Sequence, residues 1–187
     1  MPMVMAKCDL PWSEVITAVD TSLFGFGVTG AVDNSGRVGL VGRLRERSRF
    51  GGPLATVQAP RHRALGGLVR APADSDAGPD TFVELERDYI EALDWRVVAV
   101  RRWRKTRGPI HVLEESALSW GARRSARCTR NHRRRALLLS DNMSLVCAVG
   151  KGRAHDYKLL TVCRTLAGVS LSANIRFFTR WLLSLTC

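Results

Sequence analysis

The chain has 187 residues, which fits one globular domain, and its 45% hydrophobic content is enough to build a packed core. Its 29 Lys and Arg against 17 Asp and Glu give a formal net charge of +12, so a polyanionic partner is expected. The composition argues against a disulfide framework or a zinc knuckle, because the five cysteines are scattered and form no CxxC pair.

The sequence also argues against a membrane protein, because no apolar stretch reaches the roughly 18 residues of a membrane span. The N-terminus lacks a basic region followed by an apolar one, so no signal peptide is predicted and the expected location is intracellular, either cytoplasmic or nuclear. Cys128 and His132 have a spacing that could hold a metal on a helix. No second pair completes four ligands, and both residues are therefore interpreted as structural.

The basic residues fall into two dense clusters, and phosphate groups of a nucleic acid would explain both. A solvated basic face or a merely soluble tail would explain them as well, so charge alone leaves these alternatives open. The first cluster comprises Arg101, Arg102, Arg104, Lys105 and Arg107, and the second comprises Arg123, Arg124, Arg127, Arg130, His132, Arg133, Arg134 and Arg135.

The N-terminal third of the chain indicates two antiparallel strands. The first is a β-branched run from Val15 to Val19 that ends in Asp20, and the second runs from Phe24 to Val32, where Gly25 and Gly27 permit a bulge or a close backbone approach. Residues 33–36 are typical of a turn, and residues 38–41 are expected to open a third strand. Residues 51–80 are rich in Gly, Pro, Ala and Asp without an apolar period, which predicts a mobile insertion.

The remaining two thirds alternate strands and helices. Residues 95–103 suit a strand that Gly108 and Pro109 end, and apolar positions from Leu113 to Gly121 lie on one face of a helix. The expected elements that follow are a buried strand at 136–139, a helix at 143–149, a helix around 159–166 and a final strand at 175–181. This order predicts one domain of the α/β class, a mixed sheet covered by helices on its faces.

Three acidic residues stand at informative places in this scheme. Asp20 ends the first strand, Glu114 begins a helix, and Asp141 joins a buried strand to its helix. Because a pair of Mg²⁺ ions needs several carboxylates at one point, these three acids are candidate metal ligands. Taken singly, each also has an ordinary structural interpretation: a turn for Asp20, a helix-dipole partner for Glu114 and a helix cap for Asp141.

Three segments resemble, in order, the ribonuclease H-like domains of retroelement polyproteins. VITAVDTSLFGFGV, around Asp20, is similar to the family's opening strand pair. DWRVVAVRRWRKTRGPIHVLEESALSWGARR is similar to the strand, turn and helix in which I-x-V-L-E places the catalytic Glu, here Glu114 with Glu115 beside it. LLLSDNMSLVCAVGKGR is similar to the [ST]-D-N junction, whose catalytic Asp corresponds to Asp141.

The resemblance implies a ribonuclease H-like mixed sheet flanked by helices and hydrolysis of the RNA strand of RNA–DNA hybrids. It implies two Mg²⁺ ions, with Mn²⁺ as an alternative metal, bridged by Asp20 and held singly by Glu114 and Asp141. Thr21 and Ser22 would lie along the RNA strand, where the 2′-hydroxyl distinguishes RNA from DNA. A reverse transcriptase domain in the same polyprotein is an implied partner. The order Asp, Glu, Asp separates this resemblance from integrase-like relatives, which place their Glu last.

The resemblance has one departure, after the final strand. The family continues past a Trp with a Pro-Ser-Glu-like stretch and an Asn-x-Ala-Asp that supplies a fourth carboxylate, whereas six other residues follow Trp181 here. The expectation is therefore hydrolysis that is impaired by the loss of this carboxylate. The alternatives are a non-catalytic nucleic-acid-binding remnant that keeps the fold and its basic surface, or an unselected product of a decayed element. The residues expected to bind nucleic acid are Thr21, Ser22, Arg123, Arg124, Arg127, Arg133, Arg134 and Arg135.

Overall fold

Five strands form one mixed sheet in the computed structural model, which describes residues 9–44, 46, 84–103 and 109–182. The strand order is β3-β2-β1-β4-β5. Pairing is antiparallel between β1 and β2 and between β2 and β3, and parallel between β1 and β4 and between β4 and β5, so β2 alone runs against the other four strands. The strands are β1 Trp12–Thr21, β2 Gly25–Val32, β3 Arg96–Arg102, β4 Arg135–Ser140 and β5 Arg176–Trp181.

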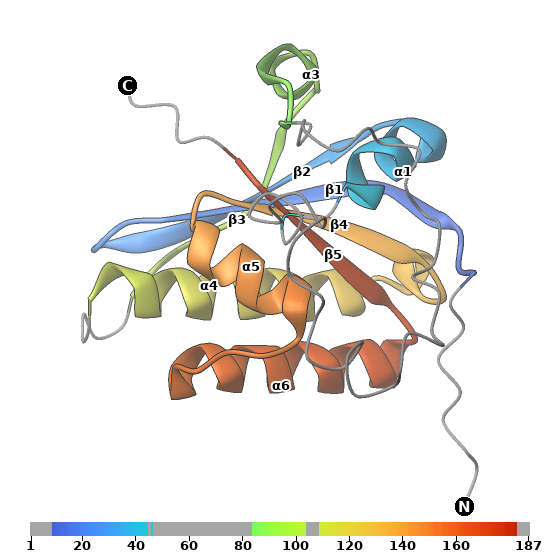
Figure 1. The fold of residues 1–187 in the computed structure, drawn as a ribbon. Helices are drawn as coiled ribbons and strands as arrows, with labels where there is room; N and C mark the ends of the chain where they lie inside the picture. Colours follow the sequence, from blue (N-terminus) through green and yellow to red (C-terminus); the bar gives the residue numbers. More distant parts are fainter. Residues whose placement is uncertain (1–8, 45, 47–83, 104–108, 183–187) are drawn as a thin grey trace, which may run out of the picture.

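Helices cover both faces of this sheet, as Figure 1 shows: α4, α5 and α6 lie on one face, and α1 and α3 lie on the other. The expected mixed α/β sheet flanked by helices is thus confirmed. The helices are α1 Ser35–Arg43, α3 Arg87–Glu91, α4 Ile110–Ala126, α5 Met143–Lys151 and α6 Tyr157–Ala173, and a single 3-10 turn spans Thr129–Asn131 between α4 and β4.

Alternate residues of the central strands build two separate cores, one on each face of the sheet. On the α4 side, Val19 and Leu138 pack with Leu118 of α4. On the α1 side, Ile16 packs with Leu137, and both side chains are fully buried. Burying one such side chain stabilises the fold by about 1.5–3 kcal/mol, so these central strands form a rigid platform whose ends can hold functional side chains.

One glycine lets α4 approach the sheet closely. A Cβ atom added at Gly121 would lie 2.9 Å from Cγ2 of Val19, closer than real Cβ contacts allow. The helix therefore lies flat against β1, and its first turns come close to the end of that strand where Asp20 is found. Gly25 has a similar role in the sheet, because a Cβ atom there would collide with the backbone of Arg101. The close approach at this glycine is thus to β3 and not between the first two strands, where it was predicted, and Gly27 has open space at its Cβ position.

The strand predicted at residues 38–41 is wrong, because these residues lie within α1. Asn34 caps this helix by accepting a hydrogen bond from the Gly36 amide at 2.8 Å, and Val38 on its inner face is fully buried. Gly39 and Gly42 lie directly against the ring of Trp12, where a side chain would collide. Tertiary packing on Trp12 thus selects a helix in a segment whose glycines and short apolar run indicate a strand in isolation.

The turn predicted at residues 33–36 is also wrong in its second half, because Ser35 and Gly36 begin α1. The other predicted strands and helices within the described residues are present with small changes of boundary. The predicted helix at Leu113 begins three residues earlier, at Ile110 directly after Pro109, and the final strand begins at Arg176. The predicted mobile insertion at 51–80 lies outside the described residues, as do Arg104, Lys105 and Arg107 of the first basic cluster.

Candidate functional site

Asp20 and Asp141 lie at the same edge of the sheet, where the parallel strands β1 and β4 end. The two strands are in register there, with Val19 paired to Ser140, and each of these residues is followed directly by one of the acids. Asp20 is exposed and Asp141 is half-buried. Because neighbouring parallel strands share one direction, their carboxyl ends bring the two acids together despite a separation of about 120 residues in sequence.

Glu114 joins this edge from α4 through a hydrogen bond to the residue after Asp141. The Nδ2 atom of Asn142 donates to Oε2 of Glu114 at 2.5 Å. The Oδ1 atom of Asn142 accepts from the Leu145 amide at 2.9 Å and thereby caps α5. The helix cap expected near Asp141 is therefore Asn142, which leaves the carboxylate of Asp141 without that structural task.

The electrostatics of Asp141 show that the three acids share one environment. Burial raises the pKa of the Asp141 carboxyl above its ordinary value, and the negative charges of Glu114 and Asp20 raise this pKa further. Burial likewise raises the pKa of Glu115, the next residue of α4, to which the charges of Asp156 and Glu114 add. The edge formed by Asp20, Glu114 and Asp141 is named here the carboxylate edge, and its concentrated negative charge favours a cation.

The oxygen donors of the carboxylate edge suit a hard divalent cation such as Mg²⁺. Within the part of the chain that the structure describes, no group of three or more His, Cys, Asp or Glu side chains converges to hold a metal ion by itself. Mg²⁺ does not need such a cage, because it is usually bound through one or two carboxylates, several waters and phosphates of a substrate. Asp20 and Asp141 offer that pair, and Glu114 adds a third carboxylate through Oε1, because the hydrogen bond from Asn142 is made to Oε2.

Two residues that the sequence did not point to hold Asp141 in place. The indole Nε1 of Trp181, at the end of β5, donates to the backbone carbonyl of Asp141 at 2.8 Å. The backbone amide of Trp181 in turn donates to Oε1 of Glu46 at 3.0 Å. Glu46 also pairs with Arg180, and both of these side chains are almost completely buried. Hydrophobic periodicity gives no signal for such a network, because a charged residue within a strand is normally expected to be exposed.

The first basic cluster reaches the carboxylate edge through β3. Arg101 and Arg102 line a hollow of about 290 Å³ together with Asp20, Thr21 and Ser22. The sequence indicated these arginines as a basic cluster without placing them beside Asp20. Cationic side chains there can hold a phosphate next to the carboxylates.

The hydroxyls of Thr21 and Ser22 are used within the turn between β1 and β2. Thr21 Oγ1 donates to the Gly25 carbonyl at 3.0 Å, and Ser22 Oγ accepts from the amides of Phe24 and Gly25, both at 3.3 Å. Both side chains lie beside Asp20, where they were predicted to follow an RNA strand. The Thr21 hydroxyl acts only as a donor in the turn and can still accept a hydrogen bond, whereas the Ser22 hydroxyl already accepts two.

The second basic cluster lies at the other end of α4. At 1.5 Å per residue, Arg123 lies about 14 Å along the helix from Glu114, and Arg127, the C-cap of α4, lies about 20 Å from it. Arg123, Arg124 and Arg127 are exposed. The structure therefore separates these arginines from the carboxylate edge, although the sequence places both features close to the same helix.

The three consecutive arginines after α4 are not equivalent. Arg133 is exposed and has a left-handed backbone with φ of 59°. Arg134 donates to the Trp12 carbonyl at 3.2 Å, and the guanidinium of Arg135 lies 5.6 Å from the centroid of the Trp12 ring. Arg134 and Arg135 thus have structural contacts, and Arg133 alone of the three is fully turned to solvent.

Comparison with protein-family models, with curated proteins and with solved structures finds no match to this chain. The argument for a function therefore rests on the residues and their geometry.

Among the described residues, no helix has the length and the hydropathy that crossing a bilayer requires. The Nε2 atom of His132 lies 2.7 Å from the Ala126 carbonyl, and Cys128 is exposed.

Proposed function

We propose that this chain is a ribonuclease H-like domain that hydrolyses the RNA strand of RNA–DNA hybrids with Mg²⁺. The observation that carries the proposal is the carboxylate edge: Asp20 and Asp141 end adjacent parallel strands, and Glu114 lies close enough for its charge to raise the pKa of Asp141. The mixed five-stranded sheet with helices on both faces is compatible with a ribonuclease H-like fold. A retroelement origin, with a reverse transcriptase domain as a partner, belongs to the same proposal.

Asp20, Glu114 and Asp141 are the residues that would hold the metal. Mg²⁺, or Mn²⁺ in its place, would supply Lewis-acid activation of a water nucleophile and stabilise the leaving oxygen of the scissile phosphate. Asp20 is the most accessible of the three acids, which suits a ligand shared between ions and substrate. Burial and the charges of Glu114 and Asp20 raise the pKa of Asp141, so a cation bound at this edge would stabilise its ionised form.

The other residues of the site bind and position the substrate. Arg101 and Arg102 offer donors to a phosphate beside Asp20, at the hollow that they share with Thr21. Asn142 holds Glu114, and Trp181 holds the backbone of Asp141, so the carboxylates keep their orientation while the nucleic acid binds. Preorganised ligands of this kind reduce the reorganisation that the reaction requires.

The proposal is tested by hydrolysis of a labelled RNA–DNA hybrid by the full chain, with Mg²⁺ and with a chelator. Asp20→Asn removes a charged ligand with little change of shape and should lower the Mg²⁺-dependent rate by roughly 100-fold or more. Asp94→Asn is the matched control, because Asp94 is exposed and takes part only in a surface ion pair with Arg96.

The results distinguish hydrolysis at the proposed site from binding of nucleic acid without hydrolysis. Equal hydrolysis by Asp20→Asn and by the unmodified chain would contradict the proposed site. A folded chain that binds the hybrid and leaves it intact in Mg²⁺ and Mn²⁺ would instead support the non-catalytic nucleic-acid-binding module.

A further inference from the structure

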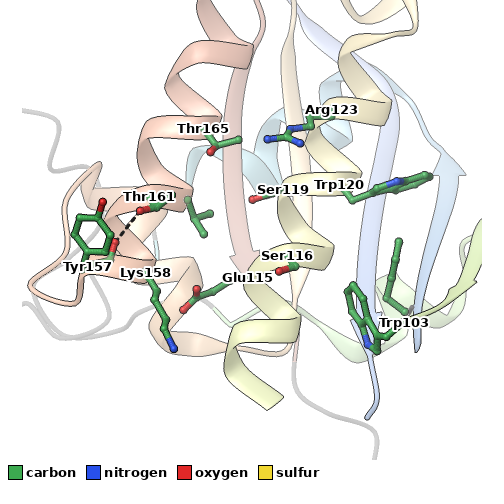
Figure 2. Close-up of a pocket in the computed structure, with 12 residues that line it drawn as sticks. Trp103, Glu115, Ser116, Ser119, Trp120, Arg123, Tyr157, Lys158, Thr161 and Thr165 are labelled. Carbon is green, nitrogen blue, oxygen red and sulfur yellow. Dashed lines mark hydrogen bonds between the residues drawn. The ribbon is translucent and has the colours of Figure 1, made fainter. Parts of the chain in front are cut away.

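A groove of about 490 Å³ runs along the outer surface of α4, between α6 and the end of the sheet. Figure 2 shows hydroxyl-bearing side chains of α6, Thr161 and Thr165, on one side of this groove. Ser116 and Ser119 of α4 lie in its middle, and Trp120 points to the opposite side. The two walls therefore differ in chemistry, one being polar and the other aromatic.

The aromatic wall is a cluster of three rings with a cation. The ring of Phe26 lies 4.8 Å from that of Trp103 and 5.4 Å from that of Trp120, measured between centroids. The guanidinium of Arg101 lies 5.4 Å from the centroid of Trp120. Phe26 is buried beneath the two tryptophans, which are themselves only half-buried. Partly exposed tryptophans over a packed ring are suited to stack on a flat ligand.

The groove has positive side chains at its surface and a carboxylate in its depth. Arg123 and Lys158 are exposed and line the groove from α4 and α6, and neither forms an ion pair with a described residue. Glu115 lines it too, but its residue is only 5% exposed and accepts no hydrogen bond from a described residue. A carboxylate in the depth repels phosphate and can accept hydrogen bonds from base N–H groups, whereas the exposed cations attract phosphate.

We propose that this groove binds a short single-stranded segment of nucleic acid, with its bases toward Trp103 and Trp120 and its phosphates along Arg123 and Lys158. The stretch of α4 from Glu115 to Arg123 spans about 12 Å, which matches three to four nucleotides that are stacked at about 3.4 Å each, as in one strand of a duplex. The alternation of stacking rings with cations is the arrangement by which proteins bind single strands without reading their sequence.

The position of the groove links it to the carboxylate edge. Glu115 directly follows Glu114 on α4, so the groove begins one residue away from the proposed metal ligands. The inference rests on the proposed function in one respect: the bound segment is taken to be a single-stranded extension of the hybrid. Binding of a single strand alone does not depend on hydrolysis, so the two proposals can fail separately.

The test is fluorescence anisotropy of a labelled twelve-residue oligothymidylate titrated with the full chain. Lys158→Glu reverses a charge within the groove, and Arg164→Glu makes the same reversal at an exposed position of α6 that does not line it. We expect Lys158→Glu and Arg123→Glu each to weaken binding roughly tenfold, since each removes a phosphate contact and adds repulsion, and Arg164→Glu to weaken it less than about twofold. The oligonucleotide should also quench tryptophan fluorescence, and Trp120→Phe should reduce that quenching.

Equal weakening by Lys158→Glu and Arg164→Glu would overturn the groove, because the oligonucleotide would then bind only through diffuse positive charge. Absence of tryptophan quenching at saturation would overturn it as well. Hydrolysis of a blunt hybrid is measured in parallel. A chain that shows the groove-dependent binding but hydrolyses no hybrid supports the groove and contradicts the proposed function, whereas hydrolysis without groove-dependent binding does the reverse.

Discussion

Asn142 joins Glu114 to the end of β4: its amide nitrogen donates to the Glu114 carboxylate while its amide oxygen caps α5. The side chain of Asn142 thus contacts two helices, α4 through Glu114 and α5 through the cap. Because Asn142 caps α5, the side chain of Asp141, one residue earlier, does not serve as the helix cap.

The first prediction uses the two functions of Asn142. Asn142→Ser keeps a good helix cap and loses the contact to Glu114, whereas Asn142→Ala loses both. We expect Asn142→Ser to lower the free energy of unfolding by about 1.5–3 kcal/mol, because it loses the hydrogen bond to a charged carboxylate, and Asn142→Ala to lower it by about 0.5–2 kcal/mol more, because it also loses the cap. Urea denaturation measures both values. Hybrid hydrolysis should fall in both variants, because Glu114 loses its positioning partner; unchanged hydrolysis in Asn142→Ser would show that Glu114 needs no such partner.

The second prediction follows from the raised pKa of Asp141. Its ordinary value is 3.8, and burial with the charges of Glu114 and Asp20 raises it in the folded protein. The folded state therefore binds the proton more tightly than the unfolded state, and stability is lost as the pH rises through this range. Asp141→Asn removes the penalty, so it should raise the urea midpoint at pH 7.5 and have a smaller effect below pH values of about 4.

The urea midpoint should also be measured at both pH values for a variant of a control carboxylate. Asp94→Asn alters an exposed side chain and should leave the urea midpoint nearly unchanged at both pH values. Destabilisation by Asp141→Asn at pH 7.5 would mean that the ionised carboxylate is compensated by its surroundings, and it would argue against a functional site that stores unfavourable charge.

The third prediction concerns the buried pair of Glu46 and Arg180. Both side chains are about 1% exposed, and the Nε atom of Arg180 lies 3.2 Å from Oε1 of Glu46. Glu46→Gln keeps the shape but leaves the arginine charge uncompensated, which should cost about 3–5 kcal/mol of unfolding free energy. Glu91→Gln breaks an exposed pair with Arg87 on α3 and should cost less than about 0.5 kcal/mol. Similar losses in the two variants would show that the Glu46 charge contributes little.

An element of this fold could be predicted from the sequence where its own residues indicate the structure that the packing requires. Ala136 to Leu139 is a continuous apolar run because β4 is covered on both faces, so it could be identified as a buried strand. The β-branched residues from Val15 to Val19 were enough to identify β1 as a strand. Residues 38–41 could not be assigned correctly, because the helix there depends on contact of Gly39 and Gly42 with Trp12, a residue more than twenty positions away.

The part of the candidate site that lies at strand ends could be predicted from the sequence, and the part that depends on contacts between distant segments could not. Asp20 and Asp141 follow recognisable strands, and parallel pairing is enough to bring such residues together. Trp181 could not be found, because its contact with Asp141 depends on β5 lying beside β4. Glu46 could not be found either, because it accepts from the Trp181 amide and belongs to a buried ion pair with Arg180 that no periodicity signals.

The last prediction concerns the second basic cluster, where the structure distinguishes neighbours that look identical in sequence. Affinity for a hybrid should fall linearly with salt on a double logarithmic scale, because each neutralised phosphate releases counterions. Arg133 is exposed, so Arg133→Ala should reduce the slope by up to about 0.9 if it contacts one phosphate.

Arg135→Ala should act differently, because the guanidinium of Arg135 lies over the ring of Trp12. Its neighbour Arg134 also contacts Trp12, through the backbone carbonyl. The loss of the Arg135 side chain removes a cation–π contact worth about 0.5–2 kcal/mol beside the α1 core, so it should lower the unfolding free energy and change the salt slope less than Arg133→Ala does. Measuring salt slopes and urea midpoints for both variants separates the two roles. Equal slopes and equal stabilities would mean that the contacts with Trp12 do not distinguish these arginines, and the cluster would then act only as a solvated basic face.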